Sequence, residues 1–227
     1  MKAKASREGG GPHPTSRLPE AILVRASQLR RGRDYLGMMR VFEAALRRHP
    51  NNYAAISGIA GAQLAMGRRR EAANSYRKAI AAAPHEPWAY VALANIYRAI
   101  RSWGQAMKWY KAAIQAAPRD AYPLSMLASF LQNRQRLKEA LALRRKAVRL
   151  SGNGGGDRHD RALEILGLAY LLVKMGREDE AVRILNAGYR STRTGLLKAE
   201  HDYYKARLTL RRYHAHLNEL RHRYSWP

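Results

Sequence analysis

Clustered basic residues are the chemical feature that stands out in this 227-residue sequence. The chain has 42 Lys and Arg against 17 Asp and Glu, which gives a formal net charge of +25. Ammonium and guanidinium groups bind carboxylates and phosphates. Ten of them in three stretches form a predicted basic surface: Arg68, Arg69, Arg70, Arg77, Lys78, Lys108, Lys111, Arg144, Arg145 and Lys146.

Few acidic residues stand near these cations. Between residues 53 and 118 there are nine Lys or Arg and two acidic residues, so most of the charge has no local counter-charge. A large field of one sign attracts an anionic partner. We therefore favour a docking surface over a merely solvated face. The partner is an acidic protein, a nucleic acid or an anionic membrane surface.

Signs of catalysis are missing from the sequence. Without cysteine there is no disulfide, thiolate metal site or Cys nucleophile. No Ser–His–Asp order, paired-carboxylate setting or histidine metal spacing stands out. The glycine run after Ser151 lacks the Lys-Ser/Thr ending of a phosphate-binding loop. We expect no enzyme activity, no cofactor and no metal.

Regular proline spacing indicates how the chain positions its basic residues. Pro50, Pro84 and Pro118 recur with a 34-residue period, each after an alanine-rich or basic helical pattern. A fixed period of this length is typical of a helical repeat array. Small residues recur with the same period where two helices must approach closely: Ala60, Ala94 and Ala128; Ala72, Ala106 and Ala140; Ala79, Ala113 and Ala147.

Helix ends follow from the same spacing. Proline cannot continue a helix and restricts the residue before it, so each of the three prolines closes one repeat. Asn52 and Asp120 fall where helix N-caps belong. Pro87 stands at the first position of a helix, where its missing N–H costs nothing.

The pattern resembles the tetratricopeptide repeat (TPR) family. Its 34-residue helix–turn–helix unit has a large residue at position 4, Leu at 7, aromatic residues at 11 and 24, small residues at 8, 20 and 27, and Pro at 32. The repeat from residue 87 matches at eight positions: Tyr90, Leu93, Ala94, Tyr97, Ala106, Tyr110, Ala113 and Pro118. The resemblance implies an all-α, right-handed α-solenoid.

Five repeats and two flanking segments follow from this frame. Residues 1–18 are a flexible basic tail, 19–52 a degenerate first repeat with Arg25 on its packing side, and 196–227 a capping helix and tail. The second to fifth repeats span residues 53–86, 87–120, 121–152 and 162–195. A glycine-rich insertion of about seven residues at 153–161 interrupts the array.

In the TPR family, ligand peptides lie in a concave groove formed by the first helix of each repeat. The matching residues here are Trp88, Val91, Asn95, Arg98, Tyr122, Ser125, Ser129, Gln132 and Asn133. Trp88 and Tyr122 are candidate aromatic anchors, or else pack between repeats. The amide of Asn95 could bind a ligand backbone. The resemblance places the basic surface on the second helices, on the convex side.

A non-enzymatic interaction module is therefore the predicted function: a scaffold, adaptor or chaperone that holds a peptide or helix of a partner protein. The alternative is a nucleic-acid-associated or ribonucleoprotein factor that binds phosphates without sequence preference. Pentatricopeptide repeats read RNA, but their period is 35, and Pro at position 32 belongs to the TPR family. The sequence shows no secretory signal or membrane-spanning run, so we expect a cytoplasmic protein without excluding an organelle.

Overall fold

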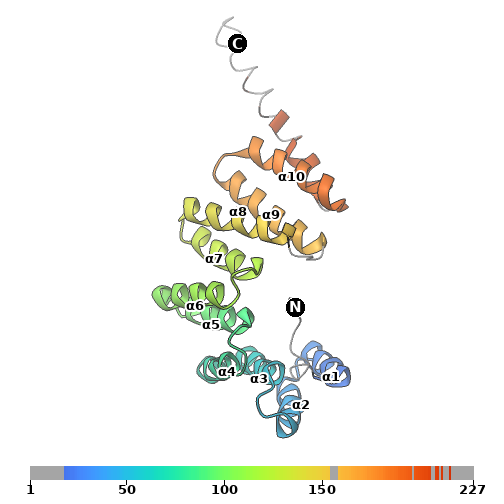
Figure 1. Cartoon of the computed structure of the whole chain (residues 1–227), viewed down its shortest axis with the longest axis vertical. Helices are drawn as coiled ribbons and strands as arrows, with labels where there is room; N and C mark the ends of the chain where they lie inside the picture. Colours follow the sequence, from blue (N-terminus) through green and yellow to red (C-terminus); the bar gives the residue numbers. More distant parts are fainter. Residues whose placement is uncertain are drawn as a thin grey trace, which may run out of the picture. The chain divides into compact units, whose positions relative to one another are not determined.

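The computed structural model describes residues 18–153, 158–195 and 197–205, together with residues 208, 209, 211 and 215. These residues are α-helical with short turns and contain no strand, so the predicted all-α class is confirmed. The labelled helices appear in Figure 1. Their bounds are α1 (Glu20–Arg31), α2 (Tyr35–Arg48), α3 (Tyr53–Ala65), α4 (Arg69–Ala82), α5 (Pro87–Ala99), α6 (Trp103–Ala116), α7 (Ala121–Asn133), α8 (Leu137–Asn153), α9 (Arg158–Lys174) and α10 (Glu178–Thr192).

Two compact modules make up the chain. The N-terminal module, Met1–Ala117, contains α1 to α6, and the C-terminal module, Pro118–Pro227, contains α7 to α10 and a helical segment at 197–205. Within each module every helix packs against its neighbours in the chain. The closest pairs are hairpins: α3 with α4, α5 with α6, α7 with α8, and α9 with α10.

Small side chains lie where the helices of a hairpin meet. In the second to fifth repeats, the alanines at positions 8, 20 and 27 are at most 1% exposed: Ala60, Ala72, Ala79, Ala94, Ala106, Ala113, Ala128, Ala140, Ala147, Ala169 and Ala181. Gly188 takes this place in α10, where an added Cβ would lie 2.8 Å from Cδ1 of Ile165. Larger side chains there would push the helices apart, since protein interiors are close-packed.

Predicted helix starts are confirmed. The Asn52 Oδ1 accepts a hydrogen bond of 3.0 Å from the backbone N–H of Ala55, which caps α3. The Asp120 Oδ1 accepts one of 2.8 Å from the N–H of Tyr122 and caps α7. Helix α5 begins at Pro87. Helices α2, α4 and α6 all end two residues before a proline of the 34-residue series.

A left-handed residue lies between the two helices of every hairpin, a regularity that sequence reasoning missed. Its φ lies between +58° and +78°, and it recurs at Arg33, Gly67, Arg101, Gln135 and Gly176. The first four follow the same 34-residue period as the prolines. The step from Gln135 to Gly176 is longer than this period by seven positions. The extra length matches the expected size of the insertion.

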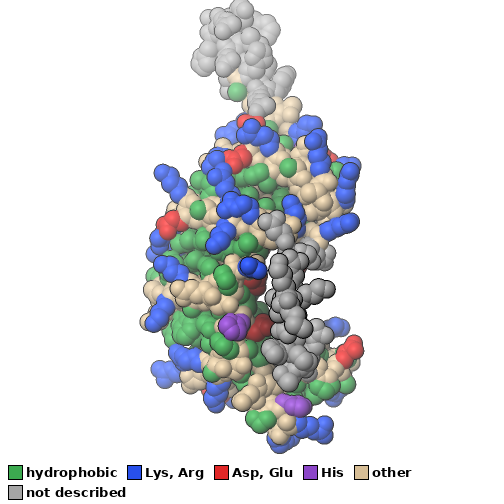
Figure 2. All heavy atoms as spheres, in the orientation of Figure 1, with side chains coloured by type: hydrophobic (Ala, Val, Ile, Leu, Met, Phe, Trp, Pro, Cys, Tyr) green, Lys and Arg blue, Asp and Glu red, His purple; other side chains and the backbone are tan. Residues whose placement is uncertain are grey.

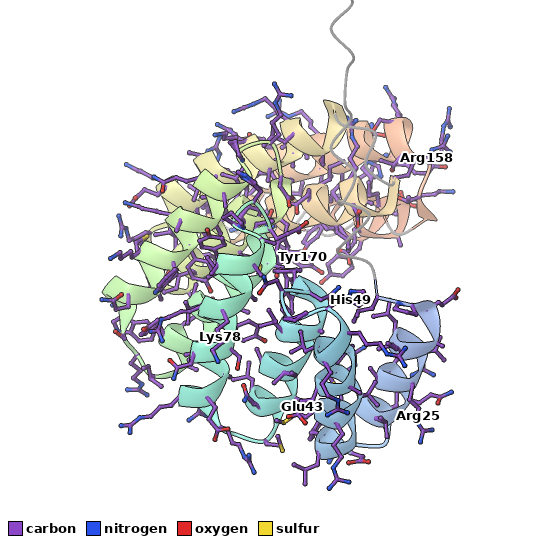
Figure 3. All side chains as sticks on the ribbon, turned by 60° about the horizontal axis from the view of Figure 1, so that its bottom comes forward. Arg25, Glu43, His49, Lys78, Arg158 and Tyr170 are labelled. Atoms are coloured by element: carbon purple, nitrogen blue, oxygen red, sulfur yellow. The ribbon has the colours of Figure 1, made fainter. Side chains whose placement is uncertain are left out.

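Differences from the expected boundaries occur around the insertion. Helix α9 begins at Arg158, four residues before the expected start of the fifth repeat, and Asp160 in its first turn suits the positive end of the helix dipole. Residues 154–157, the tail to residue 17 and most of the segment after 205 lie outside the described residues. Arg25, expected on the packing side of α1, is exposed (Figure 3).

Candidate protein-binding site

Large exposed apolar side chains recur at the second position of the repeats. Trp88 on α5 is 44% exposed, Tyr122 on α7 37% and Leu163 on α9 48%. Apolar side chains this large gain free energy when a partner covers them. Trp88 belongs to the N-terminal module, and Tyr122 and Leu163 belong to the C-terminal module.

Trp88 is held by a partner ring and still presents a face to solvent. Its ring lies edge-on to Tyr76 of α4, with 5.6 Å between the ring centroids and 67° between the planes. Tyr76 is itself 1% exposed, so it gives Trp88 a fixed support. Both sequence interpretations therefore describe part of the geometry: Trp88 packs against the preceding repeat and remains accessible.

Asn95 lies two turns further along α5 and is oriented by a buried tyrosine. The hydroxyl of Tyr110 donates a hydrogen bond of 2.6 Å to Asn95 Oδ1. This bond leaves the amide NH2 group of Asn95 as a donor for a ligand carbonyl. Arg98, near the end of the same helix, is exposed.

Two predicted groove residues are buried and do not belong to an exposed surface. Val91 is 0% exposed within α5. Ser125 is 6% exposed, and its hydroxyl donates a hydrogen bond to Oε2 of Glu164 on α9. Sequence position alone placed both on the groove side, but helices packed beside them cover them. On α7, Ser129 and Gln132 are half-buried and Asn133 is exposed.

Arg144, which the sequence assigned to the basic surface, is largely buried and does not belong to that surface. Its side chain is 13% exposed, lies 3.5 Å from Oε2 of Glu164 and donates a 2.7 Å hydrogen bond to the Ser129 hydroxyl. Burial lowers the pKa of the Arg144 guanidinium, against the opposing effect of Glu164. Burial also raises the pKa of the Glu164 carboxyl, although Ser125 and Arg144 act to lower it. Arg144 is thus an interior group with its own counter-charge.

The other nine predicted basic residues are exposed. Arg68 lies 3.7 Å from Glu71, Arg77 donates to Asn74 and Tyr97, and Arg145 pairs with Glu180 of α10. Lys and Arg side chains outnumber acidic ones on the face drawn in Figure 2. The remaining six have no ion-pair partner among the described residues: Arg69, Arg70, Lys78, Lys108, Lys111 and Lys146.

Carboxylates also gather in the C-terminal module, and sequence reasoning missed them. Asp120, Asp160 and Glu164 line a hollow of about 480 Å³. Tyr122 lines it too, and burial, helped by Asp120, raises the pKa of its phenol. Asp120 and Asp160 belong to different repeats, so only the packing of α9 near the start of α7 reveals the group.

The described residues contain neither a metal-binding cluster nor a membrane-spanning helix. No three His, Cys, Asp or Glu side chains there gather closely enough to hold a metal ion. None of the described helices combines the length and the apolar character that crossing a membrane requires.

Helices packed in hairpins throughout the described part of the chain, with small residues at 34-residue intervals, define an α-helical repeat protein. A tetratricopeptide repeat family model matches residues 63–130, which include α4, α5 and α6. Residues 63–130 therefore carry tetratricopeptide repeats, which confirms the resemblance that the sequence predicted. Comparison with curated proteins gives no significant match.

Solved structures share this fold. A thermophilic TPR protein of Thermus thermophilus is 22% identical with a TM-score of 0.58, over 82% of this chain and 98% of that chain. BtubC from P. vanneervenii is 17% identical with a TM-score of 0.63, over 81% of this chain and 80% of that chain. A chain of the APC/C hetero-tetramer Cut9–Hcn1 is 15% identical with a TM-score of 0.58, over 83% of this chain and 40% of that chain. At these identities the comparison establishes a shared fold.

Proposed function

We propose that the chain is a non-enzymatic scaffold or adaptor that binds a peptide or helix of a partner protein through the first helices of its repeats. The observation that carries the proposal is the recurrence of exposed large apolar side chains at repeat position 2, with Trp88 the largest. Aromatic side chains of this kind contribute most to protein–protein affinity when a partner covers them. One structural neighbour is part of a hetero-tetramer, which fits a role in assembly.

Polar groups beside Trp88 give the proposed site its specificity. Asn95 offers amide N–H donors to a ligand backbone, and the Tyr110 hydroxyl holds its orientation. Arg98 adds a positive charge on the same helix. The equivalent residues of α7 are Tyr122, Ser129, Gln132 and Asn133, which would bind in the same manner within the C-terminal module.

An anionic partner for the exposed basic residues is the second part of the proposal. Arg69, Arg70, Lys108 and Lys111 are exposed on α4 and α6 and have no ion-pair partner among the described residues. A surface of this kind favours an acidic protein as partner. Nucleic acid is the competing partner, and its binding weakens steeply with salt.

Affinity capture from a native lysate, treated with nuclease and washed at moderate salt, tests the proposal. Trp88→Ala should lose the captured protein while the wild type retains it. The matched control is Ile100→Ala, because Ile100 is a 53% exposed apolar residue at the other end of α5. Circular dichroism must show that both variants are folded. Equal capture by folded Trp88→Ala would show that the partner does not use this site.

A further inference from the structure

A second hollow lies between α2 and α4, in the N-terminal module. Its volume is about 680 Å³, and helix α3 forms its floor. Six apolar residues line the hollow together with Asn51, the hydrogen-bonded Gln63–Ser75 pair and one charged group, Lys78. The lining residues are Leu46, Pro50, Asn51, Ile56, Ile59, Gln63, Ser75, Lys78, Ala81 and Ala82.

The hollow lies on the side of α3 away from the proposed groove. Successive helical residues turn by about 100°. On α3, Ala54 and Gly61 are the counterparts of the groove residues Trp88 and Asn95 one repeat earlier. Ile56, Ile59 and Gln63 project about 150° away from these two positions. A ligand in this hollow would therefore not compete for the first-helix surface that contains Trp88.

The next repeat fills the corresponding place with its own aromatic rings. One repeat after Ile56, Gln63 and Ser75 stand Tyr90, Tyr97 and Trp109. The rings of Tyr90 and Trp109 lie 6.2 Å apart between centroids. Tyr97 and Trp109 are partly buried and pack against the core that α3, α4 and α5 form.

Hydrogen bonds hold two of these rings in place. The Tyr90 hydroxyl donates to the carbonyl oxygen of Pro84 at 3.1 Å. Arg77 on α4 donates to the Tyr97 hydroxyl at 2.7 Å. In the later repeat, the rings therefore fill the space between α4 and α6. The equivalent space one repeat earlier, between α2 and α4, is the open hollow. The internal comparison indicates what the open hollow fits: an aromatic side chain.

The polar groups at the hollow add a second requirement. Ser75 donates a 2.8 Å hydrogen bond to Gln63, and these two polar side chains stand where the next repeat has Trp109 and Tyr97. Lys78 is the one charged residue in the lining that the structure describes, and it lies on α4 (Figure 3). Its counterpart one repeat later is Ala112, so the charge belongs to the open hollow only.

We infer that the hollow between α2 and α4 binds an aromatic side chain of a partner peptide that carries acidic residues beside the ring. The ring packs on Leu46, Ile56 and Ile59, and a neighbouring carboxylate pairs with Lys78. Buried aromatic anchors supply most of the affinity in such contacts, whereas an exposed ion pair mainly selects the sequence. The inference does not depend on the Trp88 surface.

An NMR titration with defined peptides tests this inference. The full chain, labelled at isoleucine δ-methyl groups, is titrated with acetyl-Asp-Glu-Trp-Glu-Asp-amide. The methyl signals of Ile56 and Ile59 should shift and saturate. The same peptide with Ala for Trp, and a Lys-Lys-Trp-Lys-Lys peptide, should bind at least about tenfold more weakly, a difference of about 1.4 kcal/mol.

Variants that fill the hollow provide the decisive comparison. Ser75→Trp and Gln63→Tyr introduce the side chains of the next repeat and should each weaken binding of the tryptophan peptide about tenfold or more. Gln105→Trp adds the same ring at an exposed position of α6 outside the lining and should bind as the wild type does. Using two filling variants keeps the test decisive if one fails to fold.

Three results would overturn the inference. The methyl signals of Ile56 and Ile59 could remain unmoved at about 1 mM peptide, a concentration that detects even weak binding. The alanine peptide could shift them equally, which would show binding by charge alone. Finally, Ser75→Trp could abolish self-association in sedimentation velocity, which would make a second copy of the chain the occupant.

Discussion

The residue at repeat position 24 lies in the interior of a hairpin, and its type differs between the third and fourth repeats. Tyr110 occupies this position on α6 and donates its hydroxyl hydrogen bond to Asn95. Arg144 occupies it on α8 and donates to Ser129, the counterpart of Asn95 one repeat later. The hydrogen bond across the hairpin is preserved, but a charge has entered the interior. Glu164 on α9 supplies the counter-charge at 3.5 Å.

Replacing this charge gives a pH-dependent prediction. In Arg144→Met, Glu164 loses the positive charge and hydrogen bond of Arg144, which lower its pKa, and keeps the hydrogen bond from Ser125, so its folded-state pKa rises further above 4.5. A carboxyl with a raised folded pKa destabilises the fold as pH rises through the unfolded and then the folded value. Breaking a fully buried pair costs about 3–5 kcal/mol, and we expect about 1–3 kcal/mol at neutral pH for this part-buried pair.

Urea unfolding between about pH 5 and pH 8 measures the effect. The loss in Arg144→Met should grow as pH rises. Arg145→Met is the control, because Arg145 is exposed and an exposed ion pair contributes little. A loss that stays constant with pH, or that Arg145→Met matches, would contradict the interior role of Glu164.

At the scale of the elements, the turn inside each hairpin needs a left-handed residue. Two hairpins use glycine, Gly67 and Gly176, and three use a residue with a side chain. A residue with a Cβ pays about 1–2 kcal/mol for this conformation. A Cβ added at Gly67 would meet no atom within 4 Å, so the effect of a substitution there is confined to the backbone.

Opposite substitutions at equivalent turns should therefore have opposite effects. Gly67→Ala should lower the free energy of unfolding by about 1 kcal/mol. Gln135→Gly should raise it by up to about 1 kcal/mol, because relief of the left-handed penalty exceeds the entropy cost of glycine. Gln135→Ala keeps the penalty and serves as the control. Thermal or urea unfolding measures all three, and a destabilised Gln135→Gly would show that the Gln135 side chain stabilises its turn.

At the scale of the whole molecule, a net charge of +25 governs association. Contacts with phosphate release counterions, so their affinity falls steeply with salt, whereas contacts in an apolar groove respond weakly. Retention on heparin at increasing salt reports the first kind of contact. Capture of a protein after nuclease treatment reports the second.

Charge reversal can locate the anionic contact. Arg69→Glu with Arg70→Glu, on α4, should reduce heparin affinity and the steepness of its salt dependence. The control Arg30→Glu with Arg31→Glu changes the net charge equally at the exposed end of α1. Equal effects of the two double variants would mean that net charge, and no particular surface, attracts the anion.

Sequence alone predicted the 34-residue period, the helix ends before the three prolines and the helix starts at Asn52, Pro87 and Asp120. Proline spacing, the caps at Asn52 and Asp120 and the small residues of the hairpins act through the backbone or between helices joined by a short turn. Such local effects repeat with the sequence and can therefore be read from it. Trp88 and Tyr122, which the frame assigns to first helices, are exposed.

Only the tertiary structure decided which side chains are accessible. Val91 and Ser125 are buried, Arg144 is largely covered, and the carboxylates beside Tyr122 meet only through packing of α9. The hollow between α2 and α4 exists because three side chains are smaller than their counterparts one repeat later. Exposure and cavities depend on the sum of neighbours in space, and a single repeat does not contain those neighbours.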